Sequence, residues 1–472
     1  MIFFALLAGG PAIGLWTAFR QKRSPGSTLP AEREFGPNVV AISSVAAANS
    51  GFIMIAAVGY GYSVGLSALW MPFSYFLGDV VYWYIFAPRL IRRMKEKNKE
   101  TLSELIASQT RGRIGAPLRI AALTIFLFVG LSCVSQFLAT NKAVTAFFDT
   151  PHLLTMAAVI LVSLTAVLIG GVSSSILVNV YQGGLMLTVA IVSLAALVTE
   201  VVSLSSAGSL SLATAPDGFW DIFGQFKDQS FLLFFIAIFF LGMSFAMTQP
   251  HVLARLASGR SDLSIRSVRW RYLLLLQAMW VSMTLFGVLL YLLEPNLADP
   301  ERGVLIFGEK YLPSFAMGVI VAGIVAGALS TAESQLLVVS NALGLDVLPG
   351  LAKAYRRRNR MLYDGAFRIL CAVLVLVAAA NSEASVLKLI IVAASAVSAA
   401  FIAPIICVIF NITVDSRAMT MSIFCGGVIA AIVGLSGTAP TGFEIIFGAG
   451  AAGFVMIGLN RLFSKTSNAE PV

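Results

Sequence analysis

Charged residues are scarce in this sequence. Asp, Glu, Lys and Arg make up 12% of its 472 residues and hydrophobic residues make up 58%, whereas about a quarter of the residues in a soluble globular protein are charged. The apolar residues also form long runs that hold almost no charge. This composition excludes a soluble globular protein and a set of soluble domains.

Histidine and cysteine are scarce as well, which limits the chemistry available to the chain. Only His152 and His251 provide imidazole groups. The four cysteines all lie inside apolar runs, at Cys133, Cys371, Cys407 and Cys425. Their spacing fits neither a disulfide framework nor a zinc site, so we expect small buried hydrophobic side chains. No nucleophile, base and orienting group stand at a recognisable spacing, and we do not expect an enzyme.

Long apolar runs are what the sequence has in abundance. A bilayer core about 30 Å thick is crossed by roughly 20 apolar residues in a helix, and the chain offers such runs many times. The sequence therefore predicts an all-α polytopic membrane protein with about thirteen transmembrane helices. Numbered from 0 to 12, the predicted spans are about 1–19, 38–60, 66–88, 117–147, 152–170, 173–201, 229–248, 271–293, 314–344, 364–381, 386–410, 416–436 and 442–462.

The distribution of Lys and Arg predicts the orientation of these spans. With the N-terminus outside, five basic segments fall on the cytoplasmic side, at residues 20–33, 89–119, 255–271, 353–368 and 461–465, and the opposite loops are acidic. This asymmetry follows the positive-inside rule. We expect a multi-pass protein of the inner (plasma) membrane with a cytoplasmic C-terminus. The net charge of +9 then reflects topology and contact with the lipid bilayer, and we expect no nucleic-acid partner.

Two predicted spans have features of a broken helix. Span 1 contains Asn49, Ser50 and Gly51 after three alanines, and span 6 contains small residues at 242–246 shortly before Gln249 and Pro250. Each span is the first of a group of five, so the pair predicts inverted repeats with a binding site between them. The alternative is close helix packing through small residues, and these two spans alone do not decide between them.

The strongest motif lies in span 8. Ser330, Thr331, Glu333, Ser334 and Gln335 stand in six consecutive positions of an otherwise apolar helix, where an acid at the bilayer centre costs about 2.5–3.5 kcal/mol. Hydroxyl groups can bond back to their own helix, but a cluster that includes an acid favours a functional role. Hard cations prefer oxygen ligands. Together with carbonyls freed in a broken span 1, this cluster predicts a cation site suited to Na⁺.

At four places the sequence resembles the sodium/solute symporter family, which includes bacterial proline, pantothenate, sialic acid and sugar symporters. The family's motifs are matched, in order, at residues 101–105, 170–183, 249–255 and 330–337. The resemblance implies a 5+5 inverted-repeat (LeuT-like) core. We accordingly divide the chain into an extra N-terminal helix and linker (1–37), a first repeat (38–203), a second repeat (204–410), and two peripheral helices with a tail (411–472).

The resemblance also implies the residues of a main sodium site. Its ligands would be the backbone carbonyls of Ala46, Asn49 and Gly327 together with the hydroxyls of Ser330 and Thr331. The chain departs from the family at two positions: Asn179 replaces an acid of span 5 that helps many members to form a second sodium site, and Ala48 replaces an acid of proline carriers.

These departures favour a single coupling ion and leave a second site open. Such a second cation or proton site would involve Asn179, Glu333 and Ser334. Glu333 lies one helical turn from Ser330 and partly compensates for the missing acid. If burial keeps Glu333 protonated, it would instead carry a coupling H⁺.

The predicted function is secondary active symport, in which a cation, Na⁺ first and H⁺ as the alternative, accompanies a small organic solute by alternating access. The candidate solute contacts are Asn49, Ser50, Gly51, Gln136, Ser244 and Phe245. A neutral or zwitterionic solute is expected, such as the amino acid proline. The alternatives are a proton-coupled carrier that uses Glu333 and a non-transporting membrane solute sensor. No obligate protein partner is implied.

Overall fold

The computed structural model describes residues 2–22, 35–97, 99, 101–148, 152–207, 215–226, 231–260, 264–356, 358–382, 384–437, 439 and 442–467. This part of the chain is almost entirely helical. Its strands are two short segments, β1 (Thr110–Arg111) and β2 (Val414–Asp415), which pair in parallel and join the loop after α6 to the start of α18.

In the first half of the chain the helices are α1 (Ile2–Lys22), α2 (Pro37–Ala48), η1 (Phe52–Ala56), α3 (Ala57–Val64), η2 (Gly65–Leu69), α4 (Trp70–Val81), η3 (Tyr82–Phe86), α5 (Ala87–Lys97), α6 (Leu102–Ala107), α7 (Gly115–Thr124), η4 (Ile125–Val129), α8 (Gly130–Phe148), α9 (His152–Ser206) and η6 (Gly224–Phe226). In the second half they are α10 (Phe231–Thr248), α11 (Pro250–Ala257), α12 (Ile265–Leu290), η7 (Pro300–Arg302), α13 (Gly303–Tyr311), α14 (Ser314–Asn341), η8 (Ala342–Val347), α15 (Pro349–Leu351), η9 (Ala352–Arg356), α16 (Arg360–Ala380), α17 (Val386–Phe410), α18 (Ser416–Ser436) and α19 (Phe443–Ser467).

Ten helical segments of the described chain are long and apolar enough to cross a membrane. They are Phe52–Lys97, Gly115–Thr145, Ser173–Ser206, Phe231–Thr248, Ile265–Leu290, Ser314–Val347, Arg360–Ala380, Val386–Phe410, Ser416–Ser436 and Phe443–Phe463. Two shorter apolar helices, Ile2–Thr17 and Pro37–Ala48, cover predicted span 0 and the first half of span 1. The polytopic all-α class is confirmed, whereas the count of thirteen, the inverted repeat and the four-part division stay predictions.

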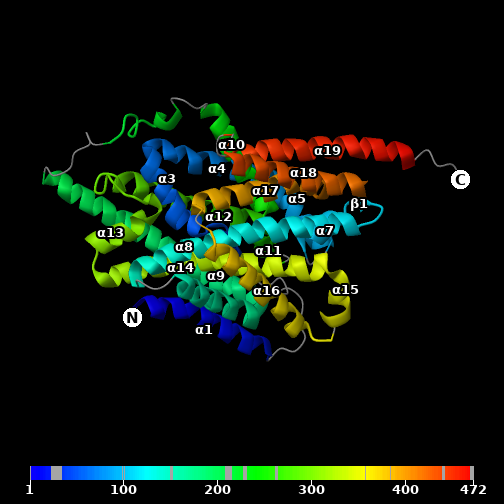
Figure 1. Ribbon diagram of the computed structural model, residues 1–472, viewed down its shortest axis with the longest axis horizontal. Coiled ribbons are helices and arrows are strands. Elements are labelled where there is room, and N and C mark those ends of the chain that lie inside the picture. The colour runs from blue at the N-terminus through cyan, green and yellow to red at the C-terminus, as the bar shows by residue number, and fades with distance from the viewer. Residues whose placement is uncertain are drawn as a thin grey trace.

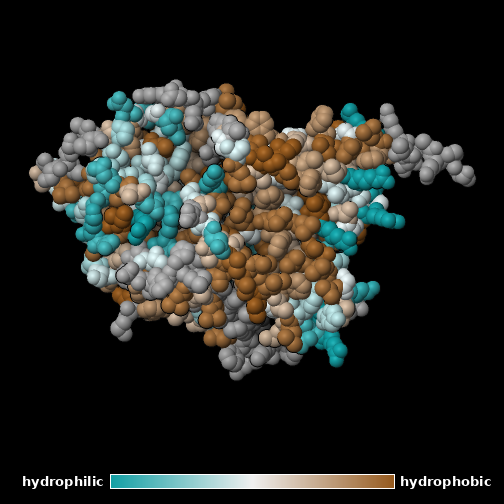
Figure 2. Space-filling view, in the orientation of Figure 1, coloured by the Kyte–Doolittle hydropathy of each residue, from teal (hydrophilic) through white to brown (hydrophobic). Residues whose placement is uncertain are grey.

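The long helices run along the longest axis of the molecule, and their outer faces form an apolar belt (Figures 1 and 2). Figure 2 shows hydrophilic residues gathered toward the two ends of that axis, on either side of the belt. The start of α1 lies at the same end as α13, and the end of α19 lies at the opposite end, near β1 (Figure 1). The first and last described helices thus begin and end at opposite ends of the longest axis.

Helix α14 occupies the centre of the bundle. In its span, 83% of the most apolar 18-residue stretch is buried inside the protein, compared with 22% for α16 and 28% for α19. Helices α2, α8 and α9 pack directly against α14. The polar cluster of α14 is therefore surrounded by protein and not by lipid, which is the setting in which polar groups at membrane depth are tolerated.

The helix of predicted span 1 is broken, as expected. Helix α2 ends at Ala48, and Asn49 leaves the helical conformation with φ −91° and ψ 78°. After the break the chain resumes as a short π-helix, η1, which continues directly into α3. The break thus separates two short helices, and it lies opposite α14.

The break predicted at residues 242–246 of span 6 is wrong, because α10 runs through this segment to Thr248. A Cβ atom on Gly242 would lie 2.2 Å from the carbonyl oxygen of Tyr75, and one on Gly78 would lie 2.0 Å from that of Phe239. The two glycines therefore let α4 and α10 approach closely, which was the alternative explanation. The interruption comes at Gln249, because Pro250 lacks an N–H group and begins a new helix, α11.

Candidate functional site

The hydroxyl groups of α14 meet the carboxyl end of α2. Ser330 donates from Oγ to the carbonyl oxygen of Ala46 at 2.8 Å. Thr331 donates from Oγ1 to the carbonyls of Ala46 and Ala47, at 3.3 and 3.2 Å. Both side chains are buried. The last carbonyls of a helix have no partner within it, so the break in span 1 makes these oxygens available to α14.

Ser330 Oγ also lies 2.8 Å from the carbonyl oxygen of Gly327, so its single O–H is shared between the carbonyls of Ala46 and Gly327. Hydroxyl and carbonyl oxygens from two helices thus converge on one buried place, and such oxygens are the ligands that hard cations take. The structure brings together Ala46, Gly327, Ser330 and Thr331 of the predicted main site.

The fifth predicted ligand, the backbone carbonyl of Asn49, stays a prediction, because the contacts that the structure gives for this residue involve its N–H and its side chain. Its backbone N–H bonds to the Val45 carbonyl at 2.7 Å, and its amide nitrogen lies 4.0 Å from the sulfur of Met279. The carbonyl of Ala47, which sequence reasoning missed, contacts Thr331.

A side chain of α8 holds the broken segment. The backbone N–H of Gly51 donates to Oε1 of Gln136 at 3.0 Å, and the N–H of Phe52 donates to Ser50 Oγ at 3.1 Å. These bonds satisfy two donors that the break leaves without a helical partner. Gly51 has an ordinary φ of −49°, but a Cβ atom there would lie 2.5 Å from that of Ala139. Glycine is therefore required by space and not by backbone conformation.

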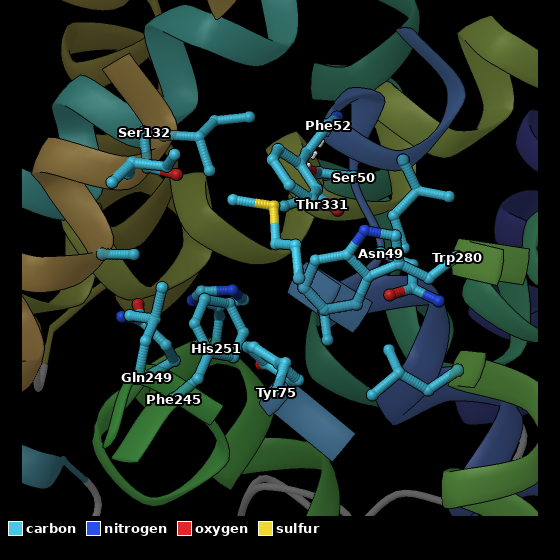
Figure 3. A pocket seen from close by; sticks show the side chains of 18 of the residues that line it. Asn49, Ser50, Phe52, Tyr75, Ser132, Phe245, Gln249, His251, Trp280 and Thr331 are labelled. Carbon is cyan, nitrogen blue, oxygen red and sulfur yellow. Dashed lines mark hydrogen bonds between the residues drawn. The ribbon is translucent and has the colours of Figure 1, made fainter. Parts of the chain in front are cut away.

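A cavity of about 60 Å³ lies beside this break, with room for several water molecules. Figure 3 shows side chains from the break, from α4, from α10 and from α12 pointing toward one another around it. Its lining includes Thr331, so the cavity is continuous with the hydroxyl cluster of α14. A small buried space that shares a residue with the predicted cation site is a candidate solute site.

The structure places some of the predicted solute contacts at the cavity and others away from it. Asn49, Ser50 and Phe245 line the cavity. Gly51 and Gln136 lie outside the lining and bond to each other. Ser244 is also outside it, because its hydroxyl donates back to the carbonyl of Leu241 at 3.2 Å.

Of the aromatic wall of this cavity, sequence reasoning named Phe245 and missed Phe52, Tyr75 and Trp280. The ring of Trp280 lies 4.6 Å from that of Tyr75 and 5.5 Å from that of Phe52, and Phe245 adjoins Tyr75. Three polar side chains were missed as well. Trp280 Nε1, Gln249 Nε2 and Gln335 Oε1 belong to lining residues and have no hydrogen-bond partner among the described residues. Among the described residues, no charged side chain lines the cavity.

The residues of the predicted second site lie together on α9 and α14. Asn179 donates from Nδ2 to Ser334 Oγ at 3.1 Å, and Gln182 donates to Oε1 of Glu333 at 3.5 Å. Arg255 enters the same cluster, where its guanidinium bonds to Ser334 and to Ser175.

Arg255 was counted in the basic segment 255–271, for which contact with the lipid surface was expected, but its side chain is only 1% exposed and lies inside the protein. Helix α11 follows the Pro250 interruption and turns this residue into the bundle. In the sequence, burial of Arg255 was indicated only by its position four residues after His251, which puts the two side chains on the same face of the helix.

Comparisons with known proteins place these features in a family. A model of the sodium:solute symporter family matches residues 29–432. The sodium/proline symporter of Escherichia coli (strain K12) is 25% identical over 421 residues, which cover 85% of this chain and 81% of that protein.

Two solved structures share the fold. A Na⁺-coupled sialic acid symporter in a substrate-bound outward-open state has a TM-score of 0.75 at 16% identity, and covers 98% of this chain and 97% of that one. A nucleobase-cation-symport-1 family transporter in a closed conformation has a TM-score of 0.57 at 14% identity, with 94% and 96% covered. At these identities the likeness concerns the fold alone.

Proposed function

Because the chain belongs to the sodium:solute symporter family, we propose that it carries a small, uncharged or zwitterionic organic solute into the cell together with Na⁺. The observation that carries the proposal is the contact of Ser330 and Thr331 with the carbonyls at the end of α2. The ion would bind among these oxygens. Family membership makes the chain a membrane transporter and supports Na⁺ as its coupling ion.

The chemistry of the oxygens suits a monovalent ion. The carbonyls and hydroxyls around Ser330 carry only partial charges, and the described residues contain no group of three or more His, Cys, Asp or Glu side chains that would hold a divalent metal. A hydroxyl that donates to a carbonyl in the ion's absence can rotate and present its lone pairs to a cation. Sodium binding would then replace two hydrogen bonds by ligand contacts that join α2 to α14.

The cavity indicates the class of solute. Its walls are aromatic and apolar, and its polar lining consists of amide, hydroxyl, indole and imidazole groups. The indole of Trp280 and the amide of Gln249 are hydrogen-bond donors suited to a carboxylate or carbonyl, whereas Gln335 Oε1 can accept from an amine. Because no charged side chain lines the cavity, a solute with net charge would be buried without a counter-charge. Proline, which the name of the E. coli relative gives as its solute, is the first compound to test.

The same geometry explains coupling. The ion would hold the end of α2 against α14, and the break that follows α2 supplies Asn49 and Ser50 to the cavity. An ion that fixes this break favours the solute-binding conformation. Since coupling free energy is reciprocal, the solute would raise the affinity for Na⁺ by the same factor.

Uptake by the purified protein in liposomes tests the proposal. A metabolite screen by thermal shift, in NaCl and in KCl, would first identify solutes, because a ligand of the folded state stabilises it by mass action. We expect accumulation of a solute driven by an inward Na⁺ gradient and absent with K⁺. Solute binding without accumulation under any ion gradient would contradict transport and favour a sensor.

A further inference from the structure

Arg255 places a fixed positive charge inside the bundle. Its side chain is 1% exposed, and its Nη1 atom donates to the His251 carbonyl at 2.9 Å. The Nη2 atom donates to Ser175 Oγ of α9 at 2.9 Å, and also to Ser334 Oγ of α14. The guanidinium therefore ends among oxygens that come from two different membrane helices.

These oxygens belong to the cluster that the sequence marks as a second cation or proton site. Asn179 bonds to the same Ser334 hydroxyl. Glu333 is the residue before Ser334 in α14, and its Oε1 accepts from Gln182 of α9 at 3.5 Å. Hydroxyl, amide and carboxylate oxygens are suitable ligands for a hard cation. In this protein the guanidinium of Arg255 donates to the hydroxyl oxygens of Ser175 and Ser334, which are therefore not free to bind a cation.

This cluster already contains a cation, so it carries no net negative charge that would attract a second one. Among its members Ser175, Asn179, Gln182, Glu333 and Ser334, only Glu333 can carry a negative charge, whereas Arg255 is always protonated. Both partners are 1% exposed. A further cation would leave a positive charge uncompensated away from water, which is costly at membrane depth.

We propose that Arg255 is a tethered cation that takes the place of a second coupling ion, so that the protein binds one Na⁺ per transport cycle. This inference rests on the proposed function, since it concerns the number of ions that the symporter binds. The Ser334 hydroxyl that Arg255 contacts donates in turn to the carbonyl of Ser330 at 2.6 Å.

Equilibrium binding of radioactive Na⁺ to the purified protein, with K⁺ as the competing control, tests this inference without a solute. We expect one Na⁺ per chain in the unaltered protein. Arg255→Gln leaves Glu333 as an uncompensated buried charge, a situation that proteins avoid, so this variant should bind two Na⁺. The double variant Arg255→Gln with Glu333→Gln removes both charges and should again bind one.

The outcomes separate this inference from the proposed function. Two Na⁺ per unaltered chain would overturn the tethered-cation role and leave symport standing, whereas no Na⁺ would overturn both. One Na⁺ in Arg255→Gln that elutes as a monodisperse folded protein would also overturn the role. If Arg255→Gln does not fold, the double variant Ser330→Ala with Thr331→Ala is measured instead. It lacks the main ion site, so it should bind no Na⁺. One Na⁺ still bound per chain would reveal a second site and contradict the inference.

Discussion

Replacing Ser330 with alanine should weaken Na⁺ binding while the protein stays folded. The Ser330 hydroxyl lies 2.8 Å from both the Ala46 and the Gly327 carbonyls, so the variant loses one ion ligand and the contact that aligns two others. A hydrogen-bonding contact to a charged group is worth about 1.5–3 kcal/mol. Since 1.4 kcal/mol is a factor of ten, the Na⁺ concentration for half-maximal effect should rise about 10- to 100-fold.

The assay is the midpoint of thermal stabilisation by NaCl, at constant ionic strength with KCl, since Na⁺ stabilises the state that binds it. Ser340→Ala is the matched control. Ser340 is buried in the same helix and donates to its own helix at Leu337 with a distance of 3.0 Å, as Ser330 does at Gly327. Both variants should lose about 1 kcal/mol of stability without sodium. A Na⁺ midpoint that moves equally in both variants, or in neither, would refute the assignment of Ser330.

Three further changes probe the break, the packing and the cavity. Gly51→Ala should abolish Na⁺-dependent stabilisation, because its Cβ would lie 2.5 Å from that of Ala139. Adding Ala139→Gly makes room for this Cβ and should restore the stabilisation. If it does not, the clash with Ala139 is not the reason that glycine is needed at position 51. Gly242→Ala should lower the free energy of unfolding in detergent by about 1–3 kcal/mol through overpacking. The control Gly184→Ala should not lower it, because a Cβ at Gly184 has open space around it. Equal effects of the two changes would contradict the close approach of α4 and α10. Trp280→Phe keeps an aromatic wall and removes the indole donor, so the solute concentration for half-maximal uptake should rise about tenfold with unchanged Na⁺ binding in the absence of solute; an unaltered solute response would remove Trp280 from the site.

The hydroxyl cluster of α14 could be predicted because polar side chains in an apolar helix are costly and their helical spacing fixes a common face. The break after α2 was predictable for a similar reason, since Asn49 and Ser50 interrupt an apolar run. The contact of the Ala47 carbonyl with Thr331 was not, because a carbonyl contact depends on backbone direction at the helix end and not on residue type.

Other features depend on packing that a single sequence does not contain. Gly242 looked like a hinge, yet its role is to admit a carbonyl of a helix far away in the chain. Arg255 looked like a solvated cytoplasmic residue because it adjoins a basic segment, and only the fold carries it inward between α9 and α14. Trp280 escaped notice because an aromatic residue in an apolar span is usually part of the core.

The proposed sodium site also predicts which segment moves during transport. The break after α2 is held on one side by Gln136 of α8 and on the other by Ser330 and Thr331 of α14. Loss of the ion would remove the stronger contacts on the α14 side. The end of α2 is then the element expected to shift between the outward-facing and inward-facing conformations.

An experimental density map of the protein in saturating NaCl, compared with one in KCl, tests the central claim most directly. We expect a sodium-dependent peak within coordination distance of the Ala46 carbonyl and of the hydroxyls of Ser330 and Thr331. A sodium-dependent peak elsewhere, with none between α2 and α14, would contradict the mechanism.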